Sequence, residues 1–567
     1  MGENINVLSG IRVNQIGYIT GMPVKISVLS AGKLTVKNSA GDIVFEKNDI
    51  EIKNDPASGD EVAFVDLGIL PEGEYTVSSG NSERKIKVAG NAYDEITGAL
   101  IKGLYYQRCG CGLDEKYAGI YAHPACHTAP ATEWEDRNVK KTIIGGWHDA
   151  GDYGKYVGPG AVTVAHMLYA YRLFPAGCTN DLNIPESGNG VPDILNEARW
   201  EIEWIIKMQR EDGAFYHKLT KDHFAPFIMP ETDTDPEYLL PPSHCATEAA
   251  IGCLALASRI YKAFDKEFAE ECLAAALKGW EWVEKNLEFK PFMSPKEVRT
   301  GMYGDWSDKD ERFWAACELF ACTREEKYRA AAEKMFNLAK DPEELNKIKE
   351  KLPPFMKHAF DNVKPGLDVT QYGWMDVSGL GAICCLFELK EKGGSILYDE
   401  LKKDFLERSG EIYNAYINSG YGTALKEDQY IWGGILTVMA NAMSMIFNYI
   451  LTGNIEMEIA AQNQFNYALG LNALDLSFVT GYGERSVMNP HHRLSGADGI
   501  EAPVPGLISG GPNKKMTYPE TKEKLGDTPA AKYFLDETPS ADTNEIAIYW
   551  NSPAIFVGVY FNSKNKN

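Results

Sequence analysis

The sequence predicts a small N-terminal β-sandwich followed by a large, mainly α-helical domain. Three observations predict this fold class. The chain has 567 residues, more than one hydrophobic core usually serves. Short runs of alternating apolar residues fill its beginning, up to about residue 90. Long amphipathic stretches fill the rest. We therefore expect a β-sandwich over residues 1–92 and a helical domain over residues 93–567.

The β-sandwich is expected from five short runs of period-two hydrophobicity. The runs cover residues 25–29, 34–36, 63–65, 75–77 and 85–88. Turn signals such as Ala40-Gly41-Asp42 and Pro71-Glu72-Gly73 separate them. Short strands at this spacing are typical of a β-sandwich.

The helices are expected from apolar residues at spacings of three and four, as in Ile194, Leu195, Ala198 and Ile202. The expected helical stretches are 193–210, 245–263, 267–287, 310–322, 325–339, 375–392, 397–417, 432–452 and 455–469. Between them run loops rich in Gly, Pro, Asp and aromatic residues, which carry the unusual sequences. Helices around a common centre with functional loops at one end would form an α-toroid.

The apolar stretch over residues 433–453 carries no charge over about the thickness of a membrane. A transmembrane helix and a fully buried helix are the two interpretations. Asn441, Ser444 and Asn448 interrupt the stretch, and the sequence contains no other span. We therefore expect a buried helix of a large helical domain.

The composition limits the partners. The formal net charge is −23, and an acidic surface repels phosphate, so we expect no nucleic acid and no membrane as partner. A neutral polysaccharide suffers no such repulsion. We expect a monomer. The first residues, MGENINVLSGIRVNQIGY, contain neither a basic nor an apolar signal region. The protein is therefore expected in the cytoplasm, or outside the cell if a signal peptide was removed.

The first candidate catalytic segment is Gly145-Gly146-Trp147-His148-Asp149-Ala150-Gly151-Asp152-Tyr153. Its two carboxylates, Asp149 and Asp152, are separated by small residues that allow a tight turn, so both can face one point. Repulsion would raise the pKa of one of them unless hydrogen bonds keep both ionised. A water held between them could be deprotonated as it attacks a substrate. A calcium loop or a solvated turn is the alternative.

The second segment contains Glu545, a lone carboxylate that enters the apolar and aromatic run Ile546 to Trp550. Apolar neighbours favour the protonated form of a carboxyl group, which suits a proton donor. A glutamate at a helix start can instead be a cap or a partner of the helix dipole. A third segment, Pro490-His491-His492-Arg493, offers hydrogen-bond donors to sugar hydroxyls, although its histidines could also bind metal or pack.

Two kinds of metal site are expected. Two thiols and two imidazoles suit a closed tetrahedral zinc site, with Cys111 and His123 as alternative ligands; the four expected ligands are Cys109, Cys126, His127 and His148. One oxygen-rich, Gly-bent loop suggests calcium, with helix capping as the alternative. Its candidate ligands are Glu186, Asn189 and Asp193. We expect no organic cofactor.

The three segments occur in the order found in glycoside hydrolase family 9, the cellulase family, which the chain resembles from Ile11 to Pro553. The resemblance implies an immunoglobulin-like β-sandwich followed by an (α/α)₆ barrel. It implies that Asp152 is the general base, that Asp149 helps to hold the water, and that Glu545 is the general acid. Asp536 stands where the family has an aspartate about nine residues before the acid, whereas Ala541 replaces the usual aromatic residue.

The same resemblance implies roles for residues around the acid and base. His491 and Arg493 would bind the sugar next to the scissile bond. In Tyr430-Ile431-Trp432-Gly433 the tryptophan would stack on a sugar face. The full set of substrate-binding candidates is His491, Arg493, Tyr430, Trp432 and Trp550, with core packing as the alternative for each tryptophan. The zinc site resembles that of the branch with an immunoglobulin-like domain. A second calcium site is implied by the resemblance, with a spacing departure and with helix capping as the alternative; its candidate ligands are Ser307, Asp308, Asp310, Glu311 and Asp376.

The resemblance implies an inverting endo-β-1,4-glucanase that cleaves β-1,4-glucosidic bonds in cellulose or related β-glucans and cello-oligosaccharides. An inverting pair of carboxyl groups is separated by about 6.5–9.5 Å, and we expect this for Asp152 and Glu545. An exo-acting β-glucosidase, cellobiohydrolase or exo-β-glucosaminidase with the same acid and base is the first alternative. A zinc-dependent hydrolase that uses His148 and Asp149 as ligands, and a non-catalytic carbohydrate-binding protein, are the others.

Overall fold

The computed structural model describes residues 9–179, 181–351, 364–390, 396–564 and 566. The chain forms two compact units. Unit 1 contains Met1–Gly103, Leu173–Leu182 and Ser409–Asn567, and unit 2 contains Leu104–Arg172 and Asn183–Arg408.

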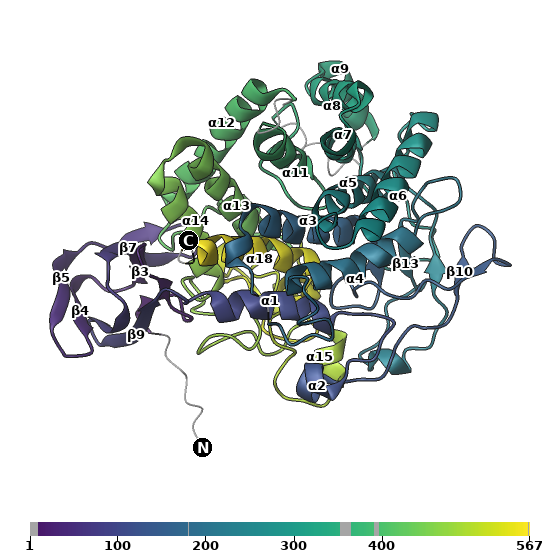
Figure 1. Ribbon diagram of the computed structural model, residues 1–567. Helices are drawn as coiled ribbons and strands as arrows, with labels where there is room; N and C mark the ends of the chain where they lie inside the picture. The colour runs from purple at the N-terminus through teal and green to yellow at the C-terminus, as the bar shows by residue number, and fades with distance from the viewer. Residues whose placement is uncertain (1–8, 180, 352–363, 391–395, 565, 567) are drawn as a thin grey trace. The chain divides into compact units, whose positions relative to one another are not determined.

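Unit 1 begins with a β-sandwich of two sheets, the purple part of the chain in Figure 1. One sheet has the order β1-β3-β7-β6, formed by Ile11–Arg12, Pro23–Val28, Asp60–Ile69 and Lys53–Asp55. The other has the order β2-β9-β8-β4-β5, formed by Tyr18–Ile19, Ser82–Ala89, Gly73–Ser79, Gly32–Asn38 and Ile43–Ile50. All five predicted runs fall in these strands except for Leu29, one residue beyond β3, which confirms the β-sandwich.

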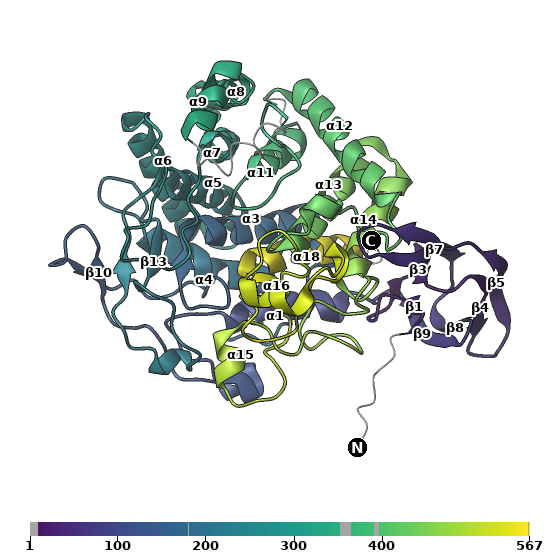
Figure 2. The same cartoon turned by 180° about the vertical axis from the view of Figure 1, so that it is seen from behind.

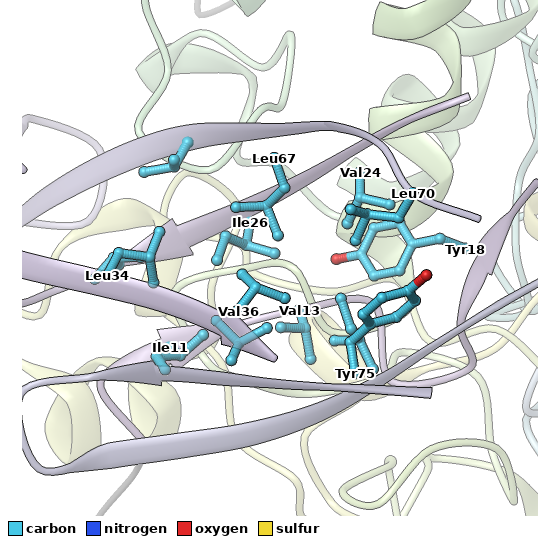
Figure 3. Packing of buried hydrophobic residues seen from close by; sticks show 14 of the residues in the cluster. Ile11, Val13, Tyr18, Val24, Ile26, Leu34, Val36, Leu67, Leu70 and Tyr75 are labelled. Atoms are coloured by element: carbon cyan, nitrogen blue, oxygen red, sulfur yellow. The ribbon is translucent and has the colours of Figure 1, made fainter. Parts of the chain in front are cut away.

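The core of the sandwich consists of the inward-facing residues of both sheets (Figure 3). Val24, Ile26 and Val28 alternate along one strand, and Leu34 and Val36 alternate along a strand of the facing sheet, all fully buried. The period-two pattern of the sequence is therefore the pattern of burial.

The helical part of unit 1 contains α13 (Gly434–Thr452), α14 (Ile455–Ala468), α18 (Ile548–Ser563) and α1 (Asp94–Tyr106) up to Gly103. The first three lie side by side, as the view from behind shows (Figure 2). The part of the chain that is described has one helix long and apolar enough to cross a membrane, α13, and 72% of its apolar window is buried inside the protein. This burial agrees with the prediction of a core helix.

Unit 2 contains most of the predicted amphipathic helices. These are α4 (Asp193–Lys207), α5 (His244–Tyr261), α6 (Lys266–Lys285), α7 (Lys309–Thr323) and α8 (Glu326–Leu338). The predicted stretch 375–392 forms α11 (Ser378–Ile383) and a π-helical turn (Cys384–Glu388), and its last two residues lie outside the described ones. The stretch 397–417 forms α12 (Tyr398–Tyr416), which crosses the boundary between the units.

Unit 2 also contains a small five-stranded sheet that the sequence did not predict. Its order is β11-β10-β14-β13-β12, formed by Lys140–Lys141, Ala131–Glu133, Tyr238–Leu239, Lys218–Thr220 and Lys155–Tyr156. Strands of two or three residues are too short to show a period of two. The sheet matters because β12 begins three residues after Asp152 and leads directly into α3 (Val157–Leu173).

Candidate active site

The carboxylate loop of unit 2 turns at two glycines. Gly145 has φ +114° and Gly146 has φ +77°, a region that residues with a Cβ rarely adopt. A Cβ on Gly146 would also lie 2.7 Å from the ring of Trp204. The glycines therefore allow the loop to lie directly against α4.

The two carboxylates of this loop are buried, with Asp149 fully inaccessible and Asp152 6% exposed. The hydroxyl of Tyr303 donates a hydrogen bond to Asp149 Oδ2 at 2.5 Å, and the backbone N–H of Gly154 donates to Asp152 Oδ2 at 3.1 Å. Burial raises the pKa of Asp149 well above its usual value; the Tyr303 hydrogen bond opposes this shift and the nearby Asp152 adds to it. The sequence analysis missed Tyr303, which is far from Asp149 along the chain.

Two glutamates of α4 hold the loop from one side. The backbone N–H of Trp147 donates to Glu201 Oε2 at 2.7 Å, and its indole N–H donates to Glu197 Oε1 at 2.9 Å. Glu197 is also paired with Arg108, and burial raises the pKa of Glu201 to about 8. Sequence analysis identified none of these supporting residues, because their partners are distant in the sequence.

A pocket lies beside Asp152 within unit 2. Its wall includes His127, Tyr153, Lys221, Phe224 and Asp233. Phe224 is exposed, whereas Tyr153, Lys221 and Asp233 are buried. The cavity volume of about 10 Å³ corresponds to one water molecule, so the pocket can hold a water beside the candidate base but not a sugar ring.

The four predicted zinc ligands converge behind this pocket. One ligand atom each from Cys109, Cys126, His127 and His148 lies within 4.8 Å of all the others. The alternative His123 does not join them, since its Nδ1 lies 2.7 Å from the carbonyl oxygen of Pro124. Two sulfur and two nitrogen atoms fit a tetrahedral zinc ion with no open position. Since His148 precedes Asp149, such an ion would fix one end of the carboxylate loop.

The first calcium candidate has its oxygen atoms engaged by protein donors. Both carboxylate oxygens of Glu186 accept hydrogen bonds from Arg108 at 3.0 Å. Asp193 accepts a hydrogen bond from Ser187 at 2.6 Å, and Asn189 accepts one from the backbone of Val191 at 2.8 Å. These contacts support the structural alternative for this loop, and its calcium role stays a prediction.

The second calcium candidate is a buried group of acids with few cations. Glu311 has a buried oxygen, Oε2, without a hydrogen-bond partner, and so does Asp305, which sequence analysis missed. Burial and mutual repulsion raise the pKa of both Asp305 and Asp310 to about 7 and that of Asp376 well above its usual value. Asp308 departs from this group, because it forms an ion pair with Arg312. Among the described residues, the ligand atoms of the remaining acids do not converge as those of the zinc candidates do, so the calcium role of this loop stays a prediction.

In unit 1, Glu545 lies between the short helix α17 (Ala541–Asn544) and α18. The indole N–H of Trp432 donates to Glu545 Oε2 at 3.2 Å. The backbone carbonyl of Glu545 accepts a hydrogen bond from Gly510 at 2.9 Å, and its backbone forms a parallel bridge with His491. Glu545 is half-buried, and the structure brings it together with Trp432 and His491 as predicted.

Asp536 supports this acid segment. Its two carboxylate oxygens accept hydrogen bonds from the backbone N–H groups of Met488 and Asn489, both at 2.8 Å. It also accepts one at 2.9 Å from the side chain of Asn544, the neighbour of Glu545. One carboxylate therefore ties the start of the His-Arg segment to the acid.

The two histidines of the third segment differ. His491 is partly exposed and its Nδ1 lies 2.7 Å from the carbonyl oxygen of Thr538, so Nδ1 carries the proton. Burial lowers the pKa of His491 to about 4 and that of His492 to about 3, so both rings are neutral near pH 7. His492 is 2% exposed and contacts Ser495, as a packing residue does. Arg493, at 6% exposed, presents little surface.

Two predicted aromatic candidates are corrected. Trp550 is 3% exposed, and a Cβ on Gly433 would lie 2.7 Å from its ring. Tyr430 is 1% exposed. Because both rings are buried, neither can stack on a sugar as it stands.

Two family models match the chain. Residues 93–558 match the model described as glycosyl hydrolase family 9, and residues 7–84 match the cellulase N-terminal ig-like domain. A cellodextrinase of Butyrivibrio fibrisolvens is 33% identical, with 96% of this chain and 98% of the relative covered.

Solved structures agree with these matches. A mutant of a thermostable endoglucanase from Alicyclobacillus acidocaldarius has a TM-score of 0.86 at 30% identity, covering 98% of this chain and all of that one (100%). A zinc-binding triple mutant of a family 9 endoglucanase has a TM-score of 0.85 at 27% identity, covering 96% and 99%. These similarities confirm the predicted fold class, an immunoglobulin-like β-sandwich followed by an (α/α)₆ barrel.

Proposed function

Since this chain belongs to glycosyl hydrolase family 9 and hydrolyses β-1,4-glucans, we propose that it does so with inversion, with Asp152 as the general base and Glu545 as the general acid. Asp152 takes a proton from a water molecule as its oxygen bonds to the anomeric carbon. Glu545 gives a proton to the glycosidic oxygen as its bond to that carbon breaks. The two carboxyl groups belong to different units, and their separation of about 6.5–9.5 Å stays a prediction.

The observation that carries this assignment is the unequal environment of Asp149 and Asp152. Asp149 is fully buried, and its pKa is raised, so it favours the protonated form. Asp152 lines the pocket, where it can reach a water molecule. Two neighbouring carboxyl groups in different environments take different roles, one as base and one as a hydrogen-bonding partner of the water. Tyr303 fixes the orientation of Asp149.

The proposed acid is oriented by neutral donors. Trp432 donates to one oxygen of Glu545, and the adjacent backbone is held by Gly510. His491, which is partly exposed and has its proton on Nδ1, can contact the hydroxyls of the sugar next to the scissile bond. The same role for Arg493, which is 6% exposed, stays a prediction. The partly exposed Trp432 is the aromatic ring available for sugar stacking.

The deciding experiment measures turnover and the anomer first formed from cello-oligosaccharides by NMR, for wild type and Glu545→Gln. We expect the α-anomer from wild type and a loss of turnover in the variant. Glu537→Gln is the matched control, because Glu537 lies in the same segment and pairs on the surface with Lys524. A first-formed β-anomer contradicts inversion, and full activity of Glu545→Gln overturns the mechanism.

We also propose endo action, which the similarity to a solved endoglucanase supports. The exo-acting alternative is supported by the similarity to a cellodextrinase. An endo-acting enzyme lowers the viscosity of carboxymethylcellulose before many reducing ends form, and it releases several products from cellopentaose. Release of a single short product from one chain end would establish the exo-acting alternative.

A structural zinc ion is part of the proposal. Cys109, Cys126, His127 and His148 would hold it, and it would supply a fixed anchor for the carboxylate loop. The similarity to a zinc-binding family 9 mutant is consistent with this. Removal of zinc by a chelator should lower the melting temperature by roughly 10 °C, because a closed site contributes directly to folding. An unchanged melting temperature and full activity of the metal-free protein would exclude this role.

The alternative of a zinc-dependent hydrolase predicts that Glu545→Gln stays active.

A calcium ion near Asp310, Glu311 and Asp376 is proposed on the unpartnered oxygen of Glu311 and the repulsion among these acids. Calcium should raise the melting temperature of protein treated with a chelator for calcium. An identical melting temperature with and without calcium would contradict it.

We propose a monomer that acts outside the cell when a signal peptide precedes this sequence, and on oligosaccharides in the cytoplasm otherwise. Light scattering of the purified protein tests whether it is a monomer. Fractionation of the native cells tests whether it acts outside the cell or in the cytoplasm.

A further inference from the structure

We propose that Asp233, together with Lys221, positions the zinc ligand His127 and thereby one wall of the pocket that contains Asp152. This inference rests on the proposed zinc site and adds two positioning residues to it. Both residues lie outside the four ligands, and the sequence analysis identified neither.

The first step is the orientation of the His127 ring. Its Nδ1 lies 3.4 Å from Nε2 of His148, on the side of the four ligand atoms. Its Nε2 lies 3.1 Å from Oδ2 of Asp233. With Nε2–H donating to the carboxylate, Nδ1 keeps the lone pair that a metal requires. A carboxylate in this position fixes the tautomer and the direction of a metal-binding histidine.

The second step is the support of Asp233 itself. Its other oxygen, Oδ1, accepts a hydrogen bond from the ammonium group of Lys221, and the two side chains are 1% and 6% exposed. Asp233 follows the short helix Pro230–Thr232, and Lys221 follows strand β13. Two separate segments thus meet at one buried carboxylate. A buried charge pair whose members both have further partners is strongly directional.

The third step is the backbone of His127. Its φ of +46° lies in the left-handed region, which non-glycine residues seldom adopt. Such a conformation persists only where the surroundings determine it. Asp233 holds the ring on one side, and a zinc ion bound by the four ligands would hold it on the other.

The consequence concerns substrate as well as metal. His127, Lys221 and Asp233 line the same pocket as Asp152. A change that frees the His127 ring therefore weakens the zinc site and moves the pocket wall beside the base. Asp233 acts through His127, so we expect its loss to lower kcat while KM changes less.

The test compares Asp233→Asn with Asp235→Asn in the full-length protein. Asp235 is the matched control, because it is 57% exposed and reaches Lys221 only at 3.9 Å. Zinc content is measured on the purified proteins, and zinc affinity and release by competition with a chromogenic chelator. We expect zinc affinity to fall about 10–100-fold in Asp233→Asn, with faster release and lower kcat, and to stay unchanged in the control.

Different outcomes test the presence of zinc and the role of Asp233. Wild-type protein that purifies without zinc and does not bind it overturns the zinc proposal itself. Zinc bound to wild type and to Asp233→Asn with equal affinity and equal release rate overturns the role of Asp233. If Asp233→Asn does not fold, Lys221→Met replaces it: release several times faster than in wild type supports the role, and unchanged release overturns it.

Discussion

The carboxylate loop of unit 2 and the acid segment of unit 1 hold their functional groups by different means. Around Asp149 and Asp152 the supports are charged or metal-binding: Glu197, Glu201 and the four predicted zinc ligands. Around Glu545 they are mostly neutral: an indole N–H, backbone amides and a side-chain amide, with Asp536 as the charged exception.

The difference follows from what each group has to do. The neighbouring carboxylates Asp149 and Asp152 repel each other when both are ionised, so their loop needs strong contacts that hold it in place. A proton donor must remain neutral until it reacts, and cations close to it would favour the ionised form. The indole N–H of Trp432 is a neutral donor that orients Glu545. Substitutions in the carboxylate loop and in the acid segment can test whether each region depends on these supports.

The largest expected effect is the loss of turnover when Asp152 or Glu545 is replaced, and it distinguishes the base from the acid. Asp152→Asn and Glu545→Gln should each lower kcat on cello-oligosaccharides by about 10²–10⁴-fold, the usual contribution of general acid–base catalysis. With a dinitrophenyl β-cellobioside, whose leaving group needs no proton, Glu545→Gln should regain most activity and Asp152→Asn should not. The reverse pattern would exchange the two roles.

The next effect tests the support of the acid. Asp536→Ala removes three hydrogen bonds that join Met488, Asn489 and Asn544. We expect kcat to fall about 10–100-fold, because small displacements of a catalytic group reduce the rate strongly. Steady-state kinetics check this, with Glu537→Gln as the neighbouring control. Equal kinetics of the two variants would show that the acid is held without Asp536.

A third effect tests the packing of the loop's anchor. A Cβ on Gly160 would lie 2.1 Å from Oε1 of Glu201, whereas a Cβ on Gly158 of the same helix, α3, meets nothing within 4 Å. Gly160→Ala should lower the free energy of unfolding by about 1–3 kcal/mol through overpacking. Gly158→Ala should be neutral or slightly stabilising, because alanine favours helix. Thermal denaturation of both variants decides whether Glu201 is fixed.

The smallest effect is a pH dependence. Burial raises the pKa of Glu201 from 4.5 to about 8, so the folded protein binds an extra proton between these values. Stability therefore falls as pH rises through this interval. In Glu201→Gln, which resembles the protonated acid, the melting temperature should change less between pH 5 and pH 9 than in wild type, by about a few degrees. Parallel curves for both proteins would contradict the shift.

The sequence predicted the elements that have one buried face. The alternating strands and the amphipathic helices α4 to α8 lie close to their predicted bounds, because one-sided burial leaves a period in the sequence. The helices α3 and α18 were not among the predicted stretches. Every residue of α18 from Ile548 to Ser563 is buried, so no polar face marks its period, and Pro553 lies inside it. Burial on all sides removes the signal on which the prediction depends.

The candidate site divides in the same way. Asp149, Asp152, Glu545 and the four metal ligands were identified because they occur in compact segments. Tyr303, Asp305 and Asp233 were missed, because each contacts its partner through the fold. The aromatic candidates show the opposite error: Trp432 is partly exposed beside Glu545, but Trp550 is in the core. A sequence shows that an aromatic residue lies near a catalytic acid and does not show which face is covered.

The division of unit 1 into distant segments has a consequence for synthesis. Tyr93 and the helix α1 that follows it are completed early, but their partners are made late. Tyr93 contacts Asn466 and Phe561, and the carbonyl of Leu100 in α1 accepts a hydrogen bond from Asn551. At about 5–20 residues per second, α1 leaves the ribosome tens of seconds before α18 exists to cover it. During that interval the late partners that bury α1 are not yet available, and a chain that stops before Ile548 lacks α18, which belongs to this unit. The half of the enzyme that contains the proposed proton donor is therefore the last to become functional.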